Sequence, residues 1–313
     1  MAKAKNLKQL SHAETRLTAG HRLCPGCAEP IIVRQVLMST DSPVLAANAT
    51  GCLEVSTTIF PFTAWNIPWI HVAFENAAAV ASGMEAMYQS LKSQGKLDAD
   101  LDYKFVAFAG DGGTYDIGIQ ALSGAVERGH DFVYVCLNNE AYMNTGIQRS
   151  SATPMGGHTT TTPAGTVRPG KRMHRKDLTA IMAAHDMPYV AQSNAGRWRD
   201  LTSKAAKAFE IEGPAFLNCL SPCPLGWGCD GAMTVDIAML AADTCMWPLY
   251  EVEHGEWKLT YKPKEKKPIE EYLELQRRFA HLFRDDKGAE MRKQMQEWVD
   301  YKWDQLLERC GEA

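Results

Sequence analysis

The 313-residue sequence contains no apolar run long enough to cross a bilayer, and residues 1–21 are polar and lack the apolar core of a signal peptide. We therefore expect a cytoplasmic protein without a membrane segment. The sequence also lacks an excess of positive charge, because its formal net charge is -4 at pH 7. This balance argues against nucleic acid as a principal partner, since neutralising phosphates requires clustered cations.

One stretch, residues 168–176, is strongly basic. Its charged and titratable members are Arg168, Lys171, Arg172, His174, Arg175 and Lys176. A solvated or subunit-facing loop would carry such residues, and so would a site for an anionic cofactor or an acidic electron carrier. The remaining composition, 45% hydrophobic and 22% charged, is typical of a packed soluble core.

Two short apolar runs, residues 104–109 and 133–137, have the character of buried parallel strands. Each run is followed by a polar turn, GDGG at 110–113 and Asn-Asn at 138–139. Residues 116–127, between the turns, have helical spacing. The pattern predicts a strand, an acidic glycine turn, a helix, a second strand and a second polar turn.

These turns contain the residue types that a metal-bound diphosphate requires. Gly110, Gly112 and Gly113 would let backbone N–H groups approach phosphate oxygens, at the positive end of the helix that follows. Magnesium prefers oxygen ligands, which Asp111, Asn139 and a nearby backbone carbonyl could supply. GDGG alone is more often only a tight strand-to-helix turn, here with Asp116 capping the helix, but a second polar turn at this distance favours the metal and diphosphate.

Nine cysteines in a reducing compartment are unlikely to form a disulfide framework, which directs attention to metal ligation. Cys24 and Cys27 form a CxxC turn, Cys52 follows a glycine, and Cys223 lies between two prolines. Four thiolates from rigid turns fit either zinc or a 4Fe-4S cluster. A thiol redox motif at CxxC and four unrelated buried thiols are the simpler alternatives.

The two polar turns together resemble the signature of thiamine-diphosphate enzymes. Residues 110–154, with NNEAYMNTG at 138–146, are similar to the β subunit of the pyruvate:ferredoxin oxidoreductase family. This family also includes other 2-oxoacid oxidoreductases and oxalate oxidoreductase, and the similarity extends over residues 23–227. It implies a thiamine-diphosphate-binding α/β fold.

The resemblance also implies roles for single residues. Asp111, the Asn139 side chain and the carbonyl of Ala141 match the magnesium ligands of the family. Asn144 and Thr145 match polar positions close to the reacting thiazolium ring. Two further carboxylates match family positions: Glu54 would be catalytic and Glu75 would bind the cofactor. Either residue could instead simply cap a helix or orient a turn.

For the cysteines, the resemblance implies a 4Fe-4S cluster held by Cys24, Cys27, Cys52 and a distant fourth ligand. Cys223 is the expected fourth ligand, and two nearby cysteines are alternatives, Cys219 and Cys229. The oxidation of a 2-oxo acid at thiamine requires an electron acceptor, and zinc has no redox chemistry. The remaining cysteines are expected to be ordinary packing or surface thiols, with Cys245 and Cys310 in helices and Cys136 in a buried strand.

The chain contains only one candidate diphosphate-binding half and no internal repeat that would supply the other. The resemblance therefore implies that an α-type partner subunit supplies the glutamate for the pyrimidine ring. The dense cysteine run of ferredoxin modules is also missing. Electrons would then leave through a ferredoxin-like subunit with further 4Fe-4S clusters, and from it to external ferredoxin.

Alternating helix and strand patterns predict an α/β fold, with a doubly wound, mainly parallel sheet and helices on both faces. The further predicted elements are helices at 30–39 and 76–92, a strand at 43–47, helix and strand pairs at 176–192 and 197–219, and a long loop at 153–170. Residues 1–248 are predicted to form the thiamine-diphosphate domain that carries the cluster. Residues 249–313 are predicted to form a charged, mainly helical extension with two short strands at 250–261.

The expected activity is oxidative decarboxylation of a small 2-oxo acid, with pyruvate and coenzyme A favoured by their frequency in the family. Oxalate without coenzyme A, or a 2-oxoisovalerate-type substrate, are alternatives. More distant alternatives are a non-redox thiamine decarboxylase with structural zinc and a zinc-stabilised scaffold.

A set of six apolar residues could shield the cofactors from water, although aromatic groups more often belong to the ordinary hydrophobic core. These residues are Ile59, Phe60, Phe62, Trp65, Trp69 and Phe74.

Overall fold

The computed structural model describes residues 5–98 and 100–312, so the first four residues of the polar N-terminal segment lie outside the described residues. The strands are β1 (Val44–Ala49), β2 (Trp69–Val72), β3 (Lys104–Gly110), β4 (Val133–Asn138), β5 (Tyr189–Asn194), β6 (Ala215–Leu220), β7 (Leu249–Glu253) and β8 (Glu256–Tyr261). They form one sheet in the order β2-β1-β3-β4-β6-β5-β7-β8. The first six strands are parallel, and β7 and β8 are antiparallel to their neighbours, which confirms a mainly parallel sheet.

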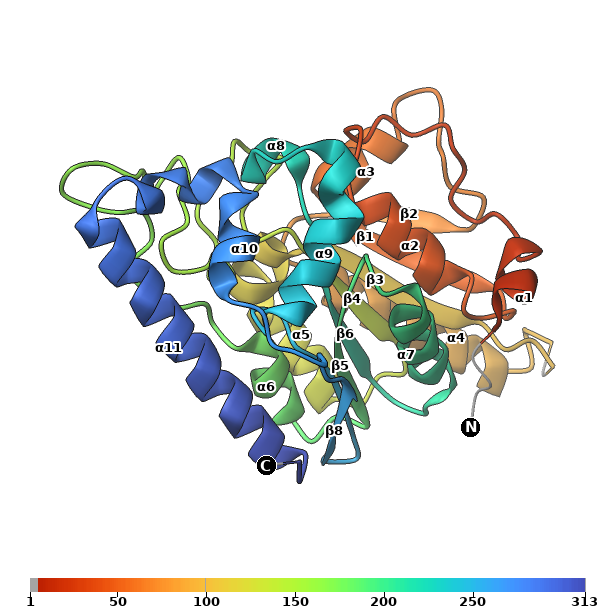
Figure 1. The fold of residues 1–313 in the computed structure, drawn as a ribbon. Coiled ribbons are helices and arrows are strands. Elements are labelled where there is room, and N and C mark those ends of the chain that lie inside the picture. The colour runs from red at the N-terminus through yellow and green to blue at the C-terminus, as the bar shows by residue number, and fades with distance from the viewer. Residues whose placement is uncertain (1–4, 99, 313) are drawn as a thin grey trace.

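Helices cover both faces of this sheet (Figure 1). Those before the last two strands are α1 (Leu7–Ser11), α2 (Glu29–Leu37), α3 (Cys52–Thr57), α4 (Ala77–Ser93), η1 (Gly112–Ile117), α5 (Ile119–Glu127), α6 (Leu178–Ala183), α7 (Trp198–Glu210), α8 (Pro224–Trp227), η2 (Gly231–Met233) and α9 (Thr234–Asp243). Side chains on β3 alternate between two cores: Phe105 and Ala107 pack with α4 and α5, and Val106 and Phe108 pack with α2 and α7. This alternation follows from the two-residue period of a strand buried on both faces.

The C-terminal extension packs on the sheet. After β8 it contains α10 (Ile269–Glu274), η3 (Arg277–Phe283) and α11 (Asp286–Arg309), and α11 runs along one side of the molecule (Figure 1). Tyr272, Phe279 and Trp303 are buried in the same core as residues of β3 and β4. The apolar side chains of the extension therefore cover the sheet of its own chain. The strands β7 and β8, which follow residue 248, continue the central sheet. The division of the chain after residue 248 stays a prediction.

The helix after the glycine turn begins later than predicted. Residues Gly112–Ile117 form a π-helical turn, so α5 starts at Ile119 rather than at residue 116. Asp116 does not cap a helix; its carboxylate accepts hydrogen bonds from the backbone N–H and the hydroxyl of Ser151. Sequence patterns also missed α1, α3, β2, α8 and α9, most of which are too short to show a full hydrophobic period.

The predicted loop at 153–170 contains neither a helix nor a regular strand, and it packs against the C-terminal extension. The backbone N–H of His158 donates to the carbonyl of Arg278 at 3.1 Å, and His281 Nε2 lies 3.0 Å from the carbonyl oxygen of Pro169.

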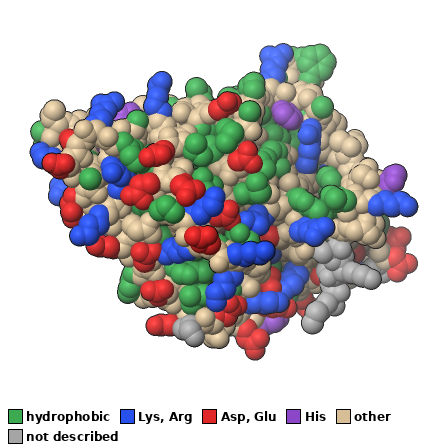
Figure 2. Space-filling model, viewed as in Figure 1, with side chains coloured by type: hydrophobic (Ala, Val, Ile, Leu, Met, Phe, Trp, Pro, Cys, Tyr) green, Lys and Arg blue, Asp and Glu red, His purple; other side chains and the backbone are tan. Residues whose placement is uncertain are grey.

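No helix within residues 5–98 and 100–312 is long and apolar enough to cross a membrane. On the face drawn in Figure 2, acidic and basic side chains are interspersed, with hydrophobic side chains between them.

Candidate metal, cofactor and cysteine sites

The turns that contain the predicted site residues meet at the carboxyl ends of neighbouring parallel strands. Asp111 directly follows β3, Asn139 follows β4, Cys52 begins α3 after β1, and Cys223 lies beyond β6. The chain places β2 outside β1 and then β3 on its other side, so β1 and β3 flank a point where the strand order reverses. In open α/β sheets, ligands bind at such points.

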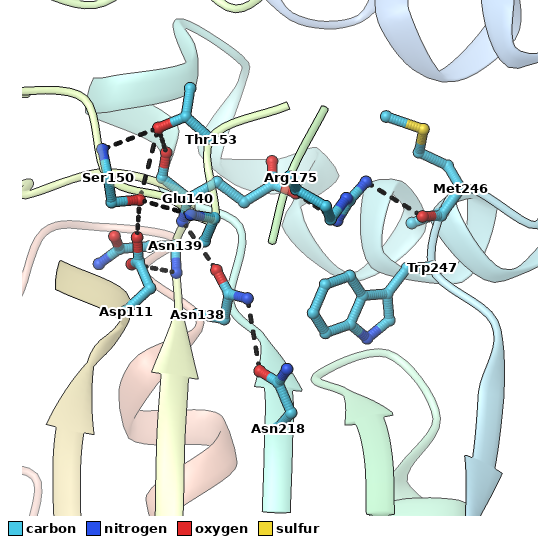
Figure 3. Close-up of polar contacts among 12 residues, drawn as sticks. Asp111, Asn138, Asn139, Glu140, Ser150, Thr153, Arg175, Asn218, Met246 and Trp247 are labelled. Carbon is cyan, nitrogen blue, oxygen red and sulfur yellow. Dashed lines mark hydrogen bonds and ion pairs between the residues drawn. The ribbon is translucent and has the colours of Figure 1, made fainter. Parts of the chain in front are cut away.

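Asp111 is fully buried and already held in place by its neighbours. Its Oδ1 accepts a hydrogen bond from the backbone N–H of Asn139 at 3.2 Å, and its Oδ2 accepts one from the hydroxyl of Ser150 (Figure 3). Burial raises the pKa of Asp111 to about 8, against the opposing effect of the Ser150 hydrogen bond. A bound cation would supply the positive charge that this buried carboxylate lacks.

Asn139 has an oxygen with no partner. Its Nδ2 donates to Oε1 of Glu29 at 3.1 Å, while its Oδ1 is buried without a hydrogen bond. Buried polar atoms are almost always paired, so an orphaned amide oxygen beside a buried carboxylate fits a metal ligand. Asn138 has a different role, because its Nδ2 donates to Tyr115 Oη at 2.9 Å, deep in the sheet.

The glycine turn borders a cavity with about 410 Å³ of atom-free space, part of it open to solvent. Seven of the predicted cofactor and metal residues line it: Cys52, Gly110, Gly112, Gly113, Asn139, Ala141 and Asn144. A Cβ on Gly112 would lie 2.5 Å from the Tyr142 ring, and one on Gly113 would lie 2.9 Å from the carbonyl oxygen of Phe74. A Cβ on Gly110 would meet nothing within 4 Å, so of these three glycines Gly110 is the one that faces open space.

The buried Asp111 does not itself line this cavity, and neither do three other residues predicted at the cofactor: Thr145, Glu54 and Glu75. Thr145 donates a hydrogen bond to Gln148 Oε1 at 2.5 Å, within its own loop. Glu54 accepts one from Thr58 at 3.4 Å. Glu75 is exposed just before α4. Their proposed roles at the cofactor stay predictions.

The CxxC turn is docked against the segment that follows Cys223. The backbone N–H of Cys27 donates to the carbonyl of Cys24 at 3.0 Å, and Gly26 between them has a φ of +78°. A Cβ at Gly26 would lie 2.4 Å from Cα of Gly231, so only glycine permits this contact. Thr234 Oγ1 also donates to the carbonyl of Gly26 at 2.6 Å.

The four predicted cluster cysteines lie within electrostatic reach of one another. Burial raises the pKa of Cys27 and of Cys52, and the charges of Glu29 and Cys223 raise both further. Burial raises the pKa of Cys223 to about 11, and the charge of Cys24 adds to this effect. In the described part of the chain, no three His, Cys, Asp or Glu side chains converge as a single metal ion requires.

The remaining five cysteines lie in other settings. Cys219 is fully buried in β6, Cys136 is fully buried in β4, and burial raises the pKa of Cys229 beside Arg278. The expectation that Cys245 lies in a helix was wrong, because α9 ends at Asp243 and Cys245 has a φ of +57° in the turn that follows. Cys310 caps the C-terminus of α11.

The apolar set that was expected to shield the cofactors divides into two groups. Trp65 and Trp69 stack with ring centroids 5.9 Å apart, and Phe74 stacks on Tyr142 beside the glycine turn. The side chains of Phe60 and Phe62 are 94% and 75% exposed, so within this chain they shield nothing. Ile59 lies between these extremes, partly buried.

Two members of the basic stretch, Lys171 and Arg175, have side chains that are largely buried and paired within the chain. Lys171 is buried and its Nζ donates to the carbonyls of Ser151 at 3.1 Å and Thr153 at 2.5 Å. Arg175 Nη1 donates to Oε1 of Glu140 at 2.9 Å (Figure 3). Both residues therefore support the turns around Asp111 and Asn139, a role that charge patterning alone did not predict.

Sequence reasoning missed Glu29 and Ser150, which contact two of the three predicted magnesium ligands, Asn139 and Asp111. Glu29 is fully buried at the start of α2, lines the cavity, and has an Oε2 without a partner. Burial raises its pKa to about 7, against the opposing hydrogen bond from Asn139. Its position two residues after Cys27 was the available signal. Ser150 had none, because only the folded chain brings it to Asp111.

Comparison with known proteins identifies the family. A model for the thiamine pyrophosphate enzyme, C-terminal TPP binding domain, matches residues 49–219. The chain is 48% identical over 310 residues to the pyruvate synthase subunit PorB of Thermotoga maritima, covering 96% of this chain and 95% of that protein. It is 51% identical over 288 residues to the PorB subunit of Methanosarcina barkeri, covering 92% and 95%. It is 41% identical over 296 residues to the ketoisovalerate oxidoreductase subunit VorB of Pyrococcus horikoshii, covering 94% and 93%.

A solved structure agrees with these sequence relatives. The fold is similar to that of the 2-oxoglutarate:ferredoxin oxidoreductase from Magnetococcus marinus, which was solved with 2-oxoglutarate, coenzyme A and succinyl-CoA bound. The TM-score is 0.55 at 25% identity, covering 71% of this chain and 70% of the other. The chain therefore belongs to the β subunits of the 2-oxoacid:ferredoxin oxidoreductase family, whose enzymes require partner subunits, and it contains the family's thiamine pyrophosphate-binding domain.

Proposed function

We propose that the turns after β3 and β4 hold thiamine diphosphate through a magnesium ion bound by Asp111, the Asn139 side-chain oxygen and the carbonyl of Ala141. The observation that carries this proposal is the orphaned, buried Oδ1 of Asn139 beside the fully buried carboxylate of Asp111. A hard divalent cation would pair with this Asn139 oxygen and supply the positive charge that the Asp111 carboxylate lacks. The backbone at Gly110, Gly112 and Gly113 would face the diphosphate, next to the open space at Gly110.

Bound thiamine diphosphate supplies the carbanion chemistry that cleaves the carboxylate from a 2-oxo acid. The chain's own contribution is to hold the diphosphate end in a fixed position. Ser150 and the Asn139 N–H orient Asp111, and the Phe74 and Tyr142 rings close the glycine turn. We also assign Asn144, Thr145 and Glu54 to the reacting end and Glu75 to the cofactor. Of these four, Asn144 has direct support, since it lines the cavity.

The second element of the proposal is a 4Fe-4S cluster held by Cys24, Cys27, Cys52 and Cys223. Neighbouring thiols of this group raise the pKa of Cys27, Cys52 and Cys223, and within the described residues the group does not converge on one point. Such spacing suits a cluster, whose four thiolates bind separate irons, better than a zinc ion with four ligands on one centre. The position of Cys219 inside β6 supports Cys223 as the fourth ligand.

For the substrate, we propose pyruvate with coenzyme A as acyl acceptor. Support comes from the identity of 48% and 51% to two pyruvate synthase subunits, above the 41% to a ketoisovalerate oxidoreductase subunit. A 2-oxoisovalerate-type substrate is the second candidate because of that last relative. Oxalate without coenzyme A is a third, and none of the described contacts favours it.

The proposed partner subunits supply the parts of the reaction for which a single diphosphate-binding half has no residues. An α-type subunit would supply the glutamate at the pyrimidine ring, and a ferredoxin-like subunit with further 4Fe-4S clusters would carry electrons to external ferredoxin in the cytoplasm. The exposed Phe60 and Phe62 would then be covered in the assembled complex.

The test is to purify the assembled complex anaerobically and measure its metal content and turnover. We expect a brown protein whose copy of this chain accounts for about four irons in addition to those of the partners. Turnover on pyruvate should require coenzyme A, while 2-oxoisovalerate and oxalate should react more slowly. Zinc in place of iron at these cysteines would refute the cluster assignment, and turnover on oxalate without coenzyme A would refute the substrate assignment.

A further inference from the structure

Arg278, in the C-terminal extension, reaches the turn that follows β4. Its Nη2 donates to Oε2 of Glu140, a residue 138 positions away whose side chain is entirely buried. Arg278 itself is only 6% exposed. Because Glu140 directly follows Asn139, the contact joins the extension to the proposed magnesium turn.

The same arginine also contacts the segment that contains Cys223. Its guanidinium carbon lies 4.0 Å from the ring centroid of Trp227, the last residue of α8, which begins immediately after Cys223. The indole Nε1 of Trp227 in turn donates to the carbonyl oxygen of Asn139 at 2.8 Å. Arg278 therefore bridges the proposed magnesium turn and the proposed cluster turn.

The turn at Glu140 needs such support. Glu140 has a φ of +65°, in the left-handed region that residues other than glycine rarely adopt. Its backbone N–H donates to Asn138 Oδ1 at 3.1 Å, and its carbonyl accepts from Thr153 Oγ1 at 2.6 Å. Its buried carboxylate is paired with both Arg175 and Arg278, and loss of either partner would leave charge undercompensated in the interior.

The guanidinium of Arg278 is fixed in one plane. Gln276 Oε1 accepts hydrogen bonds from its Nε at 2.9 Å and its Nη2 at 2.7 Å. A planar group can stack on Trp227 and at the same time donate in its own plane to Glu140. A lysine ammonium is a point charge, so it could retain the ion pair but not the stacked plane.

We propose that Arg278 is a positioning residue that fixes the turn of Asn139 relative to the turn of Cys223. The inference deepens the proposed function and rests on it, because thiamine bound at one turn must pass electrons to a cluster at the other. Small displacements matter for both steps, since a shift of roughly 1 Å in a reacting group can cost about 100-fold in rate.

The test uses the complete complex, purified anaerobically, with Arg278→Gln and Arg278→Lys. The matched control is Arg292→Gln, because Arg292 is another extension arginine that stacks on an aromatic ring, Phe283 at 4.4 Å, and donates to a carbonyl, that of Leu282. Two quantities are measured: the dissociation constant of thiamine diphosphate at saturating magnesium, and the rate of cluster reduction in a single turnover.

For Arg278→Gln we expect the dissociation constant to rise about tenfold and the reduction rate at saturating thiamine diphosphate to fall about tenfold, as for losses of ligand-orienting contacts. Iron content should stay at the wild-type value, because the four thiolates are unchanged. Arg278→Lys should lie between Arg278→Gln and the wild type. Arg292→Gln should change both quantities by less than about twofold.

Trp227→Phe provides an independent arm, because it keeps an aromatic face for Arg278 but removes the indole N–H that binds the Asn139 carbonyl. It should slow cluster reduction about threefold or more. If Arg278→Gln and Trp227→Phe both behave like Arg292→Gln, the inference is wrong. If Arg278→Gln does not assemble, Trp227→Phe decides alone. A wild-type complex without iron or without thiamine diphosphate binding would overturn the proposed function, and this inference with it.

Discussion

The proposed magnesium turn and the proposed cluster site are built in opposite ways. Asp111 and Asn139 are buried at the ends of adjacent strands and are joined by a direct hydrogen bond. The cysteines come from three distant segments, and Cys24 is exposed. The first site is therefore largely organised by the sheet itself, whereas the second depends on how separate turns dock. We therefore expect loss of a cluster cysteine to lower the affinity for thiamine diphosphate only slightly. Loss of a magnesium ligand should lower that affinity much more.

The most severe change should be Asp111→Ala in the assembled complex. Thiamine diphosphate affinity in the presence of magnesium should fall by more than about 100-fold, since losing a ligand costs more than the 10- to 100-fold typical of residues that orient one. Isothermal titration of the cofactor measures this directly. Asp116→Asn is the control, because Asp116 is a second carboxylate of the same turn and its hydrogen-bond partner is Ser151. Equal affinities for both variants would remove Asp111 from the site.

Removing one cysteine should separate the two sites. With Cys52→Ala we expect loss of most of the iron and of turnover, while thiamine diphosphate affinity changes by less than about threefold. Iron analysis and cofactor titration on the same sample provide both values. Cys310→Ala serves as the control, because Cys310 lies at the end of α11 and should keep full iron content. Unchanged iron in Cys52→Ala would contradict the cluster assignment.

Ser150→Ala tests how far the magnesium turn is organised in advance. The substitution removes the hydroxyl that donates to Asp111 Oδ2 and leaves Asp111 in place. Magnesium affinity in the presence of thiamine diphosphate should fall about tenfold, measured from the magnesium dependence of turnover. Ser151→Ala, one residue further along, removes a hydrogen bond to Asp116 and should have a smaller effect. A larger loss in Ser151→Ala would place the metal elsewhere.

Substitutions of the turn glycines should have the smallest effects. Gly113→Ala should lower stability, whereas Gly110→Ala should weaken cofactor binding. Gly113→Ala places a Cβ 2.9 Å from a backbone carbonyl, so the free energy of unfolding should drop by about 1–3 kcal/mol. Gly110→Ala meets open space, so the cofactor-free chain should stay near wild-type stability while diphosphate binding weakens. Thermal melting with and without cofactor separates the two outcomes. Equal destabilisation by both substitutions, with unaltered cofactor affinity, would argue against a diphosphate at Gly110.

The same contrast explains what the sequence could predict. The unit from β3 to Asn139 is local, so strand periodicity and turn chemistry placed Asp111 and Asn139 at one edge of the sheet. The parallel sheet and the mainly helical character of the C-terminal extension were also predictable from apolar patterns, whereas the surface that the extension covers was not. The π-helical turn at Gly112–Ile117 was not, because the tight packing of its glycines against Phe74 and Tyr142 is set by distant residues.

Long-range polar contacts were beyond the reach of sequence patterns. Glu29 meets Asn139 across 110 positions, and Arg278 meets Glu140 across 138. A charge run such as residues 168–176 predicts solvent exposure on average, and the buried Lys171 and Arg175 depart from it because backbone carbonyls and a carboxylate surround them. Buried charges of this kind are recognisable only when their partners are in view.

In the proposed enzyme, one chain places thiamine diphosphate next to a redox cluster. The most direct measurement is electron paramagnetic resonance of the anaerobic wild-type and Asp111→Ala complexes, frozen after pyruvate and coenzyme A are added without external acceptor. We predict a reduced-cluster signal in the wild type that is lost in Asp111→Ala, although dithionite still reduces the cluster in both. A pyruvate-dependent signal of equal size in Asp111→Ala, or no signal in the wild type, would contradict the account.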